Sequence, residues 1–149
     1  MKKFSLALAL ILVSAVFTNL SANALSINNK SNKTTANNTF ERPWGTYTVL
    51  DKGNGYLIKT ITVNPGQKLS LQKHNYRAEH WVVLEGTAKV IKEIKELTLK
   101  PGESVDIEIK EIHSLQNPYD TKLKILEVQR GEIIDENDIE RLSDIYGRK

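Results

Sequence analysis

Two of the chain's three histidines lie in the stretch LQKHNYRAEHW, residues 71–81. On an extended strand, residues i and i+2 point to the same face, so Gln72 and His74 would project together. After the bend at residues 75–78, Glu79 opens the next antiparallel strand and can face back toward them. Amide, imidazole and carboxylate groups gathered in this way form a ligand set for a divalent metal.

A second stretch repeats the layout of the first. Residues 61–74, ITVNPGQKLSLQKH, and residues 97–113, LTLKPGESVDIEIKEIH, each run from a strand through a Pro-Gly turn and a second strand to a histidine. Two such hairpins predict that His74 and His113 meet across a barrel. The alternative interpretation is that the repeat arises by chance, because Pro-Gly turns are common. His74 and His113 would then be ordinary half-buried histidines and not metal ligands.

Strand alternation separates the candidate site residues from residues expected to pack. His80 follows Glu79 directly, so it would point to the opposite face and be structural. Trp81 and Val83 share the face of Glu79 and are expected to fill the barrel. Trp44 is expected to be a packing anchor.

The rest of the chain predicts an all-β fold. β-branched and aromatic residues fill short extended segments, and Gly, Pro, Asn and Asp separate them. About eight such segments with closely spaced turns indicate a sandwich or barrel. These segments are residues 45–51, 55–63, 67–74, 80–86, 87–93, 95–100, 103–109 and 123–131.

From Asp135 onward the pattern changes. Ile139, Leu142 and Ile145 recur at i, i+3 and i+6, and the segment begins with acidic residues, which favour a helix N-terminus. We therefore expect a short amphipathic helix at the C-terminus.

The N-terminus has the composition of a secretory signal peptide. Two lysines precede the apolar run FSLALALILVSAVF, and an Ala-x-Ala exit ends at Ala24. This run is shorter than the roughly 20 residues that a bilayer span needs. We predict a cleaved signal at residues 1–24, a flexible linker at 25–39, rich in Asn, Ser and Thr, and one domain at 40–149. The mature protein would be periplasmic or secreted, with no membrane span.

Charge and cysteine content exclude several classes of protein. The formal net charge is +3, and two of the basic residues lie in residues 1–24, so the mature chain is nearly balanced. A nucleic-acid-binding protein would show a concentrated basic face. The chain has no cysteine, which excludes disulfides and a lipid-modified cysteine anchor.

The spacing of the candidate site resembles the two sequence motifs of the cupin superfamily, which are small jelly-roll barrels. Gln72 stands where the first motif usually has a histidine. In the second motif Glu108 and Lys110 replace the usual Pro and Gly. The residues in register are Gly66, His74, Glu79 and Gly86 in the first motif and Gly102, His113 and Asn117 in the second.

A narrower resemblance rests on Gln-x-His followed by RAEHW at residues 77–81. Together with RPWG (42–45), LSLQ (69–72) and EVQ (127–129), it is similar to the isomerase domain of type II mannose-6-phosphate isomerases. That domain is often fused behind a mannose-1-phosphate guanylyltransferase. We therefore expect a link to GDP-mannose and polysaccharide biosynthesis.

The resemblance implies a divalent metal, usually zinc, and a direct role for Arg77 in converting mannose 6-phosphate to fructose 6-phosphate. It also implies a homodimer. The general base stays open among Lys59, Lys73 and Glu85. The metal ligands that it implies are Gln72, His74, Glu79 and His113.

Some features depart from that family. The family has three consecutive histidines where this chain has residues 74–76, HNY, and a methionine at the position of Lys73. No Gly-rich nucleotide-binding segment precedes residue 40, so we do not expect GDP-mannose synthesis by this chain alone. The alternative functions are an exported, non-catalytic cupin that binds a sugar or polysaccharide, and an iron oxygenase, which Gln72 makes less favourable.

Cleavage after Ala24 can be tested directly. N-terminal sequencing of the exported protein is expected to begin at Leu25, because the small residues before it suit signal peptidase. An exported chain that still begins at Met1 would contradict this prediction.

Overall fold

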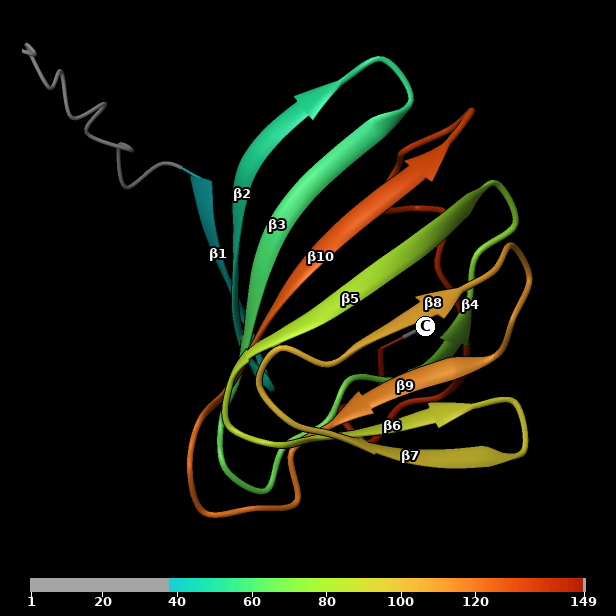
Figure 1. Cartoon of the computed structure of the whole chain (residues 1–149). Coiled ribbons are helices and arrows are strands. Elements are labelled where there is room, and N and C mark those ends of the chain that lie inside the picture. The colour runs from blue at the N-terminus through green and yellow to red at the C-terminus, as the bar shows by residue number, and fades with distance from the viewer. Residues whose placement is uncertain (1–37, 149) are drawn as a thin grey trace, which may run out of the picture. The chain divides into compact units, whose positions relative to one another are not determined.

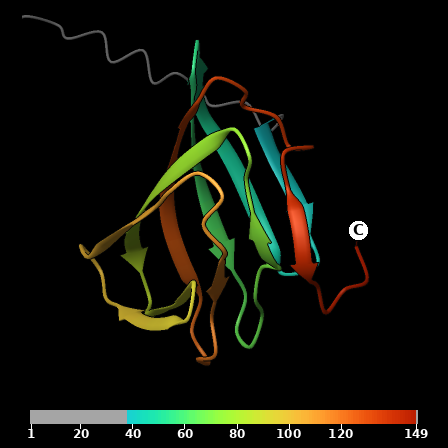
Figure 2. The ribbon, with the colours of Figure 1, turned by 90° about the vertical axis from the view of Figure 1, so that its right-hand side faces the viewer.

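Two antiparallel β-sheets curve around one interior as a jelly-roll barrel in the computed structural model, which describes residues 38–148 (Figure 1). The six-stranded sheet has the order β1-β2-β3-β10-β5-β8, and the five-stranded sheet has the order β11-β4-β9-β6-β7. A view turned by 90° shows how the strands wrap around the interior (Figure 2). The strands are β1 (Thr39–Arg42), β2 (Gly45–Gly53), β3 (Tyr56–Val63), β4 (Leu71–Lys73), β5 (Arg77–Glu85), β6 (Ala88–Lys92), β7 (Lys95–Leu99), β8 (Ser104–Ile107), β9 (His113–Gln116), β10 (Leu123–Gly131) and β11 (Glu140–Ser143).

The predicted all-β barrel is confirmed. Each of the eight predicted segments overlaps one strand, β2 to β8 and β10. The structure adds three strands of four residues each, β1, β9 and β11. All three are short, so period-two alternation gives them little signal.

The two Pro-Gly segments are not hairpins, which corrects the interpretation of the repeat. β3 lies in the six-stranded sheet and β4 in the five-stranded sheet, and β7 and β8 are divided in the same way. The Pro-Gly turns therefore carry the chain from one sheet to the other. β4 and β5 also lie in different sheets, so Glu79 faces Gln72 and His74 across the barrel instead of from a hairpin partner.

The expected C-terminal helix is wrong. Residues 135–139 form a turn and loop, and β11 then pairs with β4. Leu142 and Ile145 are 46% and 58% exposed, so the apolar period that suggested a helix buries little surface. A short helix is marginal without a buried face, whereas an unpaired edge of β4 offers backbone hydrogen bonds to an extended segment.

The predicted signal peptide lies outside the described residues, as does most of the predicted linker. β1 begins at Thr39, one residue before the predicted start of the domain. Within residues 38–148 no helix is long and apolar enough to cross a membrane.

The inner face of the barrel is apolar at one end and polar at the other. β5 turns Trp81 and Val83 inward along one half and Arg77 and Glu79 inward along the other. β10 divides in the same way, and its antiparallel register with β5 puts Gln129 opposite Glu79. Burial of each large apolar side chain contributes about 1.5–3 kcal/mol. The apolar end thus stabilises the fold, and the polar end holds the candidate site.

Gly86 is required where the chain leaves β5 for β6. Its φ is +80°, and a Cβ atom there would lie 2.5 Å from the backbone oxygen of Lys122. Gly102 has a similar φ of +86°, but a Cβ atom would meet no heavy atom within 4 Å. We expect Gly102→Ala to cost about 1–2 kcal/mol from its left-handed backbone, and Gly86→Ala to cost a further 1–3 kcal/mol or so from the clash.

Urea unfolding of both variants measures the difference, and Gly102→Ala is the matched control for backbone conformation. Equal losses of unfolding free energy would contradict the close approach of residue 86 to Lys122.

Candidate metal centre

Three side chains converge at the polar end of the barrel. His74 directly follows β4, Glu79 lies in β5 and His113 opens β9. One possible ligand atom from each lies within 4.8 Å of the others, and all three residues are buried. The five-stranded sheet supplies the histidines and the six-stranded sheet supplies the carboxylate. The cluster therefore forms only when the two sheets face each other.

Backbone carbonyls set the proton positions on both imidazoles. Nδ1 of His74 lies 2.7 Å from the carbonyl oxygen of Asp138, and Nδ1 of His113 lies 2.8 Å from that of Glu111. A carbonyl oxygen only accepts hydrogen bonds, so each Nδ1 carries a proton and donates it. In the neutral tautomer this leaves Nε2 with its lone pair toward the site. Histidines that bind metals in proteins commonly make this second contact.

The Nε2 atoms of both histidines lie near the carboxylate of Glu79. Nε2 of His74 is 3.1 Å from Oε1, and Nε2 of His113 is 3.8 Å from Oε2. Nε2 of His113 is buried and makes no hydrogen bond. Burial also lowers the pKa of His113, which favours the neutral imidazole. A buried nitrogen lone pair without a donor, beside a second imidazole and a carboxylate, fits a divalent metal.

Three donors hold the Glu79 carboxylate in place. Nε of Arg77 and Nε2 of Gln129 donate to Oε1 at 3.2 and 3.1 Å, and Nε1 of Trp81 donates to Oε2 at 3.0 Å. Burial acts to raise the pKa of Glu79, but the neighbouring imidazoles of His74 and His113 and the charge of Arg77 outweigh it and hold the pKa well below its usual range. Glu79 is therefore ionised, as a carboxylate ligand must be.

Gln72 lies beside the cluster through strand register. β4 pairs with β9 so that Gln72 is opposite His113, and directly opposed residues share one face of a sheet. Its Oε1 accepts a hydrogen bond from Oγ of Ser70 at 2.9 Å and keeps a second lone pair. Its role as a fourth ligand stays a prediction.

Arg77 is fully buried, and three groups surround its guanidinium. In addition to its bond to Glu79, it donates from Nη1 to the carbonyl oxygen of Asp135 at 2.6 Å, and Nη2 lies 3.5 Å from Nε2 of His74. This geometry orients the carboxylate and adds a fixed positive charge to the site. The direct role of Arg77 in isomerisation stays a prediction.

Of the three open acid–base candidates, Lys59 alone lies inside the barrel. Lys73 is part-exposed and forms an ion pair with Glu140 at 3.1 Å, and Glu85 is exposed at the end of β5. Lys59 is 6% exposed, and its Nζ lies 3.1 Å from Oε1 of Glu127.

A buried row of polar side chains that the sequence pattern did not predict ends at Glu79. The amide of Gln129 donates to Glu79 and, at 2.7 Å, to Oε1 of Glu127, which in turn pairs with Lys59. We call Glu79, Gln129, Glu127 and Lys59 the polar ladder. Alternation along β10 contained the signal, because two polar residues take inward positions after Leu123 and Ile125.

Charge compensation defines the state of the polar ladder. Burial raises the pKa of Glu127, and the nearby charge of Glu79 raises it further. Burial acts to lower the pKa of Lys59, but the charges of Glu127 and Glu136 outweigh this and raise the pKa above its usual value. Lys59 is therefore a permanent cation, and Glu127 is the carboxyl in the ladder that most readily takes a proton.

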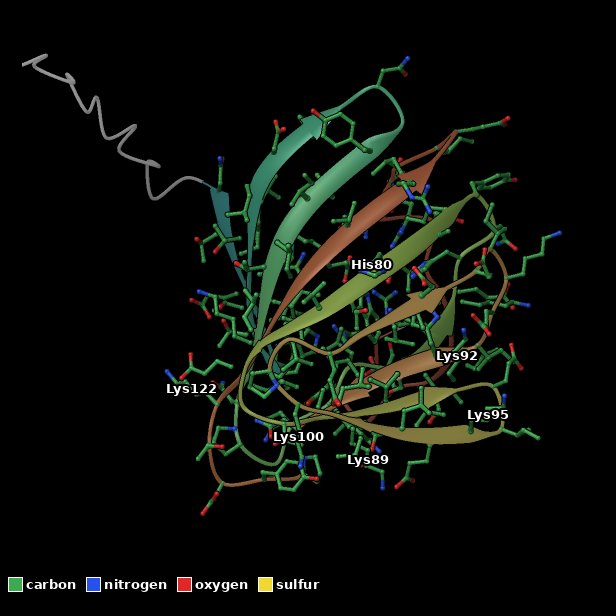
Figure 3. The ribbon with its side chains drawn as sticks, viewed as in Figure 1. His80, Lys89, Lys92, Lys95, Lys100 and Lys122 are labelled. Carbon is green, nitrogen blue, oxygen red and sulfur yellow. The ribbon has the colours of Figure 1, made fainter. Side chains whose placement is uncertain are left out.

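The predicted outward position of His80 and the predicted burial of the packing residues are confirmed. His80 lies on the outer side of β5, where its Nδ1 is 2.7 Å from Oδ1 of Asp106 (Figure 3). Trp44, Trp81 and Val83 are buried in the core. Trp81 has a second role, because its indole N–H also donates a hydrogen bond to Glu79.

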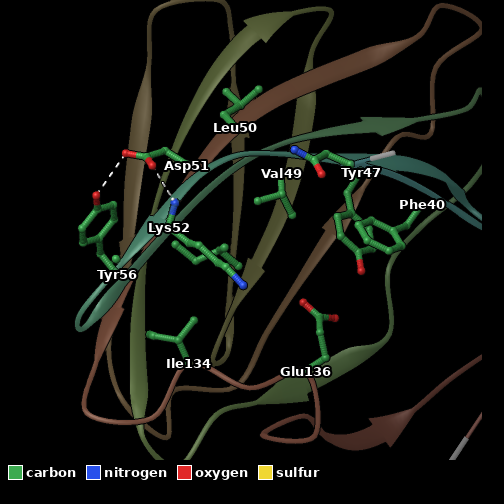
Figure 4. A pocket seen from close by; sticks show the side chains of 12 residues that line it. Phe40, Tyr47, Val49, Leu50, Asp51, Lys52, Tyr56, Ile134 and Glu136 are labelled. Carbon is green, nitrogen blue, oxygen red and sulfur yellow. Dashed lines mark hydrogen bonds between the residues drawn. The ribbon is translucent and has the colours of Figure 1, made fainter. Parts of the chain in front are cut away.

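A separate hollow of about 560 Å³ lies over β2 and β3 (Figure 4). The stacked rings of Phe40 and Tyr47, 4.8 Å apart, form part of its wall. Ile134 and Glu136 form another part. Glu136 also lies 3.4 Å from Nζ of Lys59, so this wall adjoins the polar ladder.

The two-sheet barrel has the cupin fold, and the buried His-Glu-His cluster lies inside it. Among solved structures it is similar to the capsular polysaccharide assembling protein CapF from Staphylococcus aureus, with a TM-score of 0.63 and 20% identity over 71% of this chain and 34% of that one. At this identity the likeness concerns the fold alone.

The family model of the mannose-6-phosphate isomerase C-terminal domain matches residues 28–144, and the chain belongs to this family. It is 50% identical over 107 residues to the alginate biosynthesis protein AlgA of Pseudomonas aeruginosa, and 47% identical over 106 residues to the mannose-1-phosphate guanylyltransferase RfbM of Salmonella typhimurium. These matches cover 72% and 71% of this chain but only 22% of each relative.

Metal binding by the triad predicts a clear difference among the chain's three histidines. His74→Ala and His113→Ala are expected to weaken Co²⁺ or Zn²⁺ binding by more than about 100-fold, because loss of a group that merely orients a ligand already costs 10–100-fold. His80→Ala is the matched control and is expected to bind as the unchanged protein does. Elemental analysis and Co²⁺ absorbance titration measure this. Equal metal content in all three variants would contradict the site.

Proposed function

We propose that the protein is a metal-dependent isomerase that interconverts mannose 6-phosphate and fructose 6-phosphate. The observation that carries the proposal is the convergence of two histidines, with Nδ1 of each bound to a backbone carbonyl, on one ionised carboxylate. Family membership supports the substrate. The names of the relatives place them in alginate biosynthesis and mannose-1-phosphate guanylyl transfer, which supports a link to sugar-nucleotide supply.

The site suits the chemistry of the aldose–ketose conversion. That reaction moves a proton between C1 and C2 through an enediolate, and a bound dication would supply the positive charge that stabilises this oxyanion. Among the proposed ligands Glu79 is the only anion, so the ion would keep a net charge of roughly +1. Arg77 orients Glu79 and adds a fixed charge that suits a sugar phosphate or enediolate.

Proton transfer is best assigned to Glu127. It is the buried carboxyl whose pKa is raised, and the amide of Gln129 connects it to Glu79. Lys59, as a permanent cation, would balance Glu127 when that carboxyl is ionised. A carboxyl with a raised pKa is the type of group that enzymes use as a general acid or base near neutral pH.

Zinc is the proposed metal, because imidazole and carboxylate ligands suit it. A homodimer and an exported location remain part of the proposal, on the family resemblance and on the N-terminal sequence respectively.

Turnover tests the proposal. The purified protein, supplied with Zn²⁺, Co²⁺ or Mn²⁺, is expected to convert mannose 6-phosphate to fructose 6-phosphate in a coupled assay. Glu79→Ala is expected to abolish turnover and metal binding together. Glu127→Gln is expected to lower kcat by about 100-fold or more with unchanged metal content, which is the typical contribution of a general acid or base. His80→Ala is the control.

A second candidate is a cupin that binds a sugar or polysaccharide without turnover. The fully engaged guanidinium of Arg77 favours it, because an arginine bound to Glu79 and Asp135 has fewer donors left for a substrate. Stoichiometric metal with no turnover under any of the three metals would contradict the isomerase and leave this candidate.

A further inference from the structure

The segment from residue 132 to residue 139 lies against the candidate metal centre, and we call it the strap. It connects β10 to β11 and so joins the six-stranded sheet to the five-stranded sheet. The helix that the sequence predicted from Asp135 onward would have begun within it. Its turn is closed by its own backbone, with N–H of Asp138 donating to the carbonyl oxygen of Asp135 at 3.0 Å.

Asp138 holds the strap to the loop that carries His74. Its carboxylate accepts hydrogen bonds from the backbone N–H groups of Asn75 and Tyr76, at 2.9 and 3.1 Å. Its carbonyl oxygen accepts from Nδ1 of His74 at 2.7 Å. Asp138 is 8% exposed, so these bonds are shielded from water. One residue thus sets both the path of the loop and the tautomer of a proposed ligand.

Further contacts connect the strap to the other sheet, among them one at 3.9 Å between the carboxylate of Asp138 and Nη1 of Arg77. The carbonyl oxygen of Asp135 accepts from Arg77, which also holds Glu79. The carboxylate of Glu136 pairs with Lys59, the last member of the polar ladder that begins at Glu79. Every proposed ligand of the triad except His113 is therefore connected to the strap, directly or through one hydrogen-bonded row.

Most of the strap is exposed, and Asp138 is its one buried residue. Ile134 and Glu136 border the hollow of about 560 Å³ over β2 and β3 (Figure 4). A segment that is held at a few polar contacts and is otherwise exposed has room to move away from the site. Its position is then decided by the polar contacts at the site, because little apolar burial opposes its release.

We propose that Asp138 is a positioning residue of the metal centre and that metal binding and closure of the strap are one coupled equilibrium. A closed strap presents Nε2 of His74 and the Glu79 carboxylate in the geometry for a metal. By linkage, a metal bound there stabilises the closed strap by the same factor. This inference rests on the metal site of the proposed function and does not depend on turnover.

Amide hydrogen exchange on the purified protein tests the coupling without any variant. Saturating Zn²⁺ is expected to slow exchange at Asn75 and Tyr76, the two amides bound to Asp138, by about tenfold or more. The β6–β7 hairpin, residues 92–96, is the internal reference and is expected to be unchanged. Glu79→Ala is expected to show no effect of Zn²⁺. Equal exchange at Asn75 and Tyr76 with and without bound Zn²⁺ would overturn the inference.

Asp138→Asn tests the reciprocal effect. An amide has one acceptor oxygen, so one of the two backbone N–H groups would face the Asn N–H₂ group instead of an acceptor. Co²⁺ affinity is expected to fall by about 10–100-fold, as for other groups that orient ligands. Asp120→Asn, the same change at an exposed loop acid, is expected to bind Co²⁺ as the unchanged protein does.

The possible failures are distinguishable. If the unchanged protein binds no Co²⁺, the metal centre of the proposed function is wrong and the coupling is wrong with it. If the unchanged protein binds Co²⁺ but Asp138→Asn binds it equally well, the strap is purely structural and only the coupling is overturned.

Discussion

A buried, ionised carboxylate is the constraint on which the polar end of the barrel depends. Moving a carboxylate out of water costs several kcal/mol, and the cost is offset only by a complete set of donors and nearby positive charge. Glu79 receives these from Arg77 and Trp81 on its own strand and from Gln129 on the neighbouring one. The polar side chains on the inner face around Glu79 are there to supply these donors and this charge.

The same constraint explains why a second carboxyl and a lysine lie deep in the barrel. Gln129 has one amide group, which it shares between Glu79 and Glu127. Two carboxyl groups so connected repel each other, and Lys59 supplies the compensating charge at 3.1 Å from Glu127. A row of groups that stabilises one buried charge thus also places a carboxyl of raised pKa close to the candidate metal site. The side chains that stabilise the buried charge of Glu79 are therefore the same ones that would take part in proton transfer.

The location of the site between the two sheets has a consequence for its behaviour. Each sheet supplies part of the cluster, and the strap supplies the backbone carbonyl that orients His74. A site divided in this way is sensitive to small shifts of one sheet against the other, and the apolar end of the barrel limits those shifts through burial of its large side chains. The strap has little apolar packing around it, because most of its residues are exposed.

The sequence alone determined the features that depend on local spacing. Alternation at Gln72 and His74, the separation of Glu79 from His80 and the apolar positions of β10 all follow from the period of a strand, so the all-β fold and the outward His80 were predictable. The meeting of His74 with His113 was predicted from hairpins that the structure does not contain, and the ligand set came from the family resemblance. The family resemblance rested on short sequence motifs around the same residues, and the family match confirms it.

Only the tertiary structure decided which sheet each strand joins and what faces the site from far along the chain. The helix expected near Ile139 became a strap and an edge strand, because β4 needed a partner and the helix had no face to bury. Contacts between residues far apart in the sequence also hid the roles of Asp138 and Gln129, and the connection of Lys59, itself a candidate, to the site. Their contacts with the site join residues 50 to 64 positions apart, or pass through a third residue, and no local pattern records such pairings.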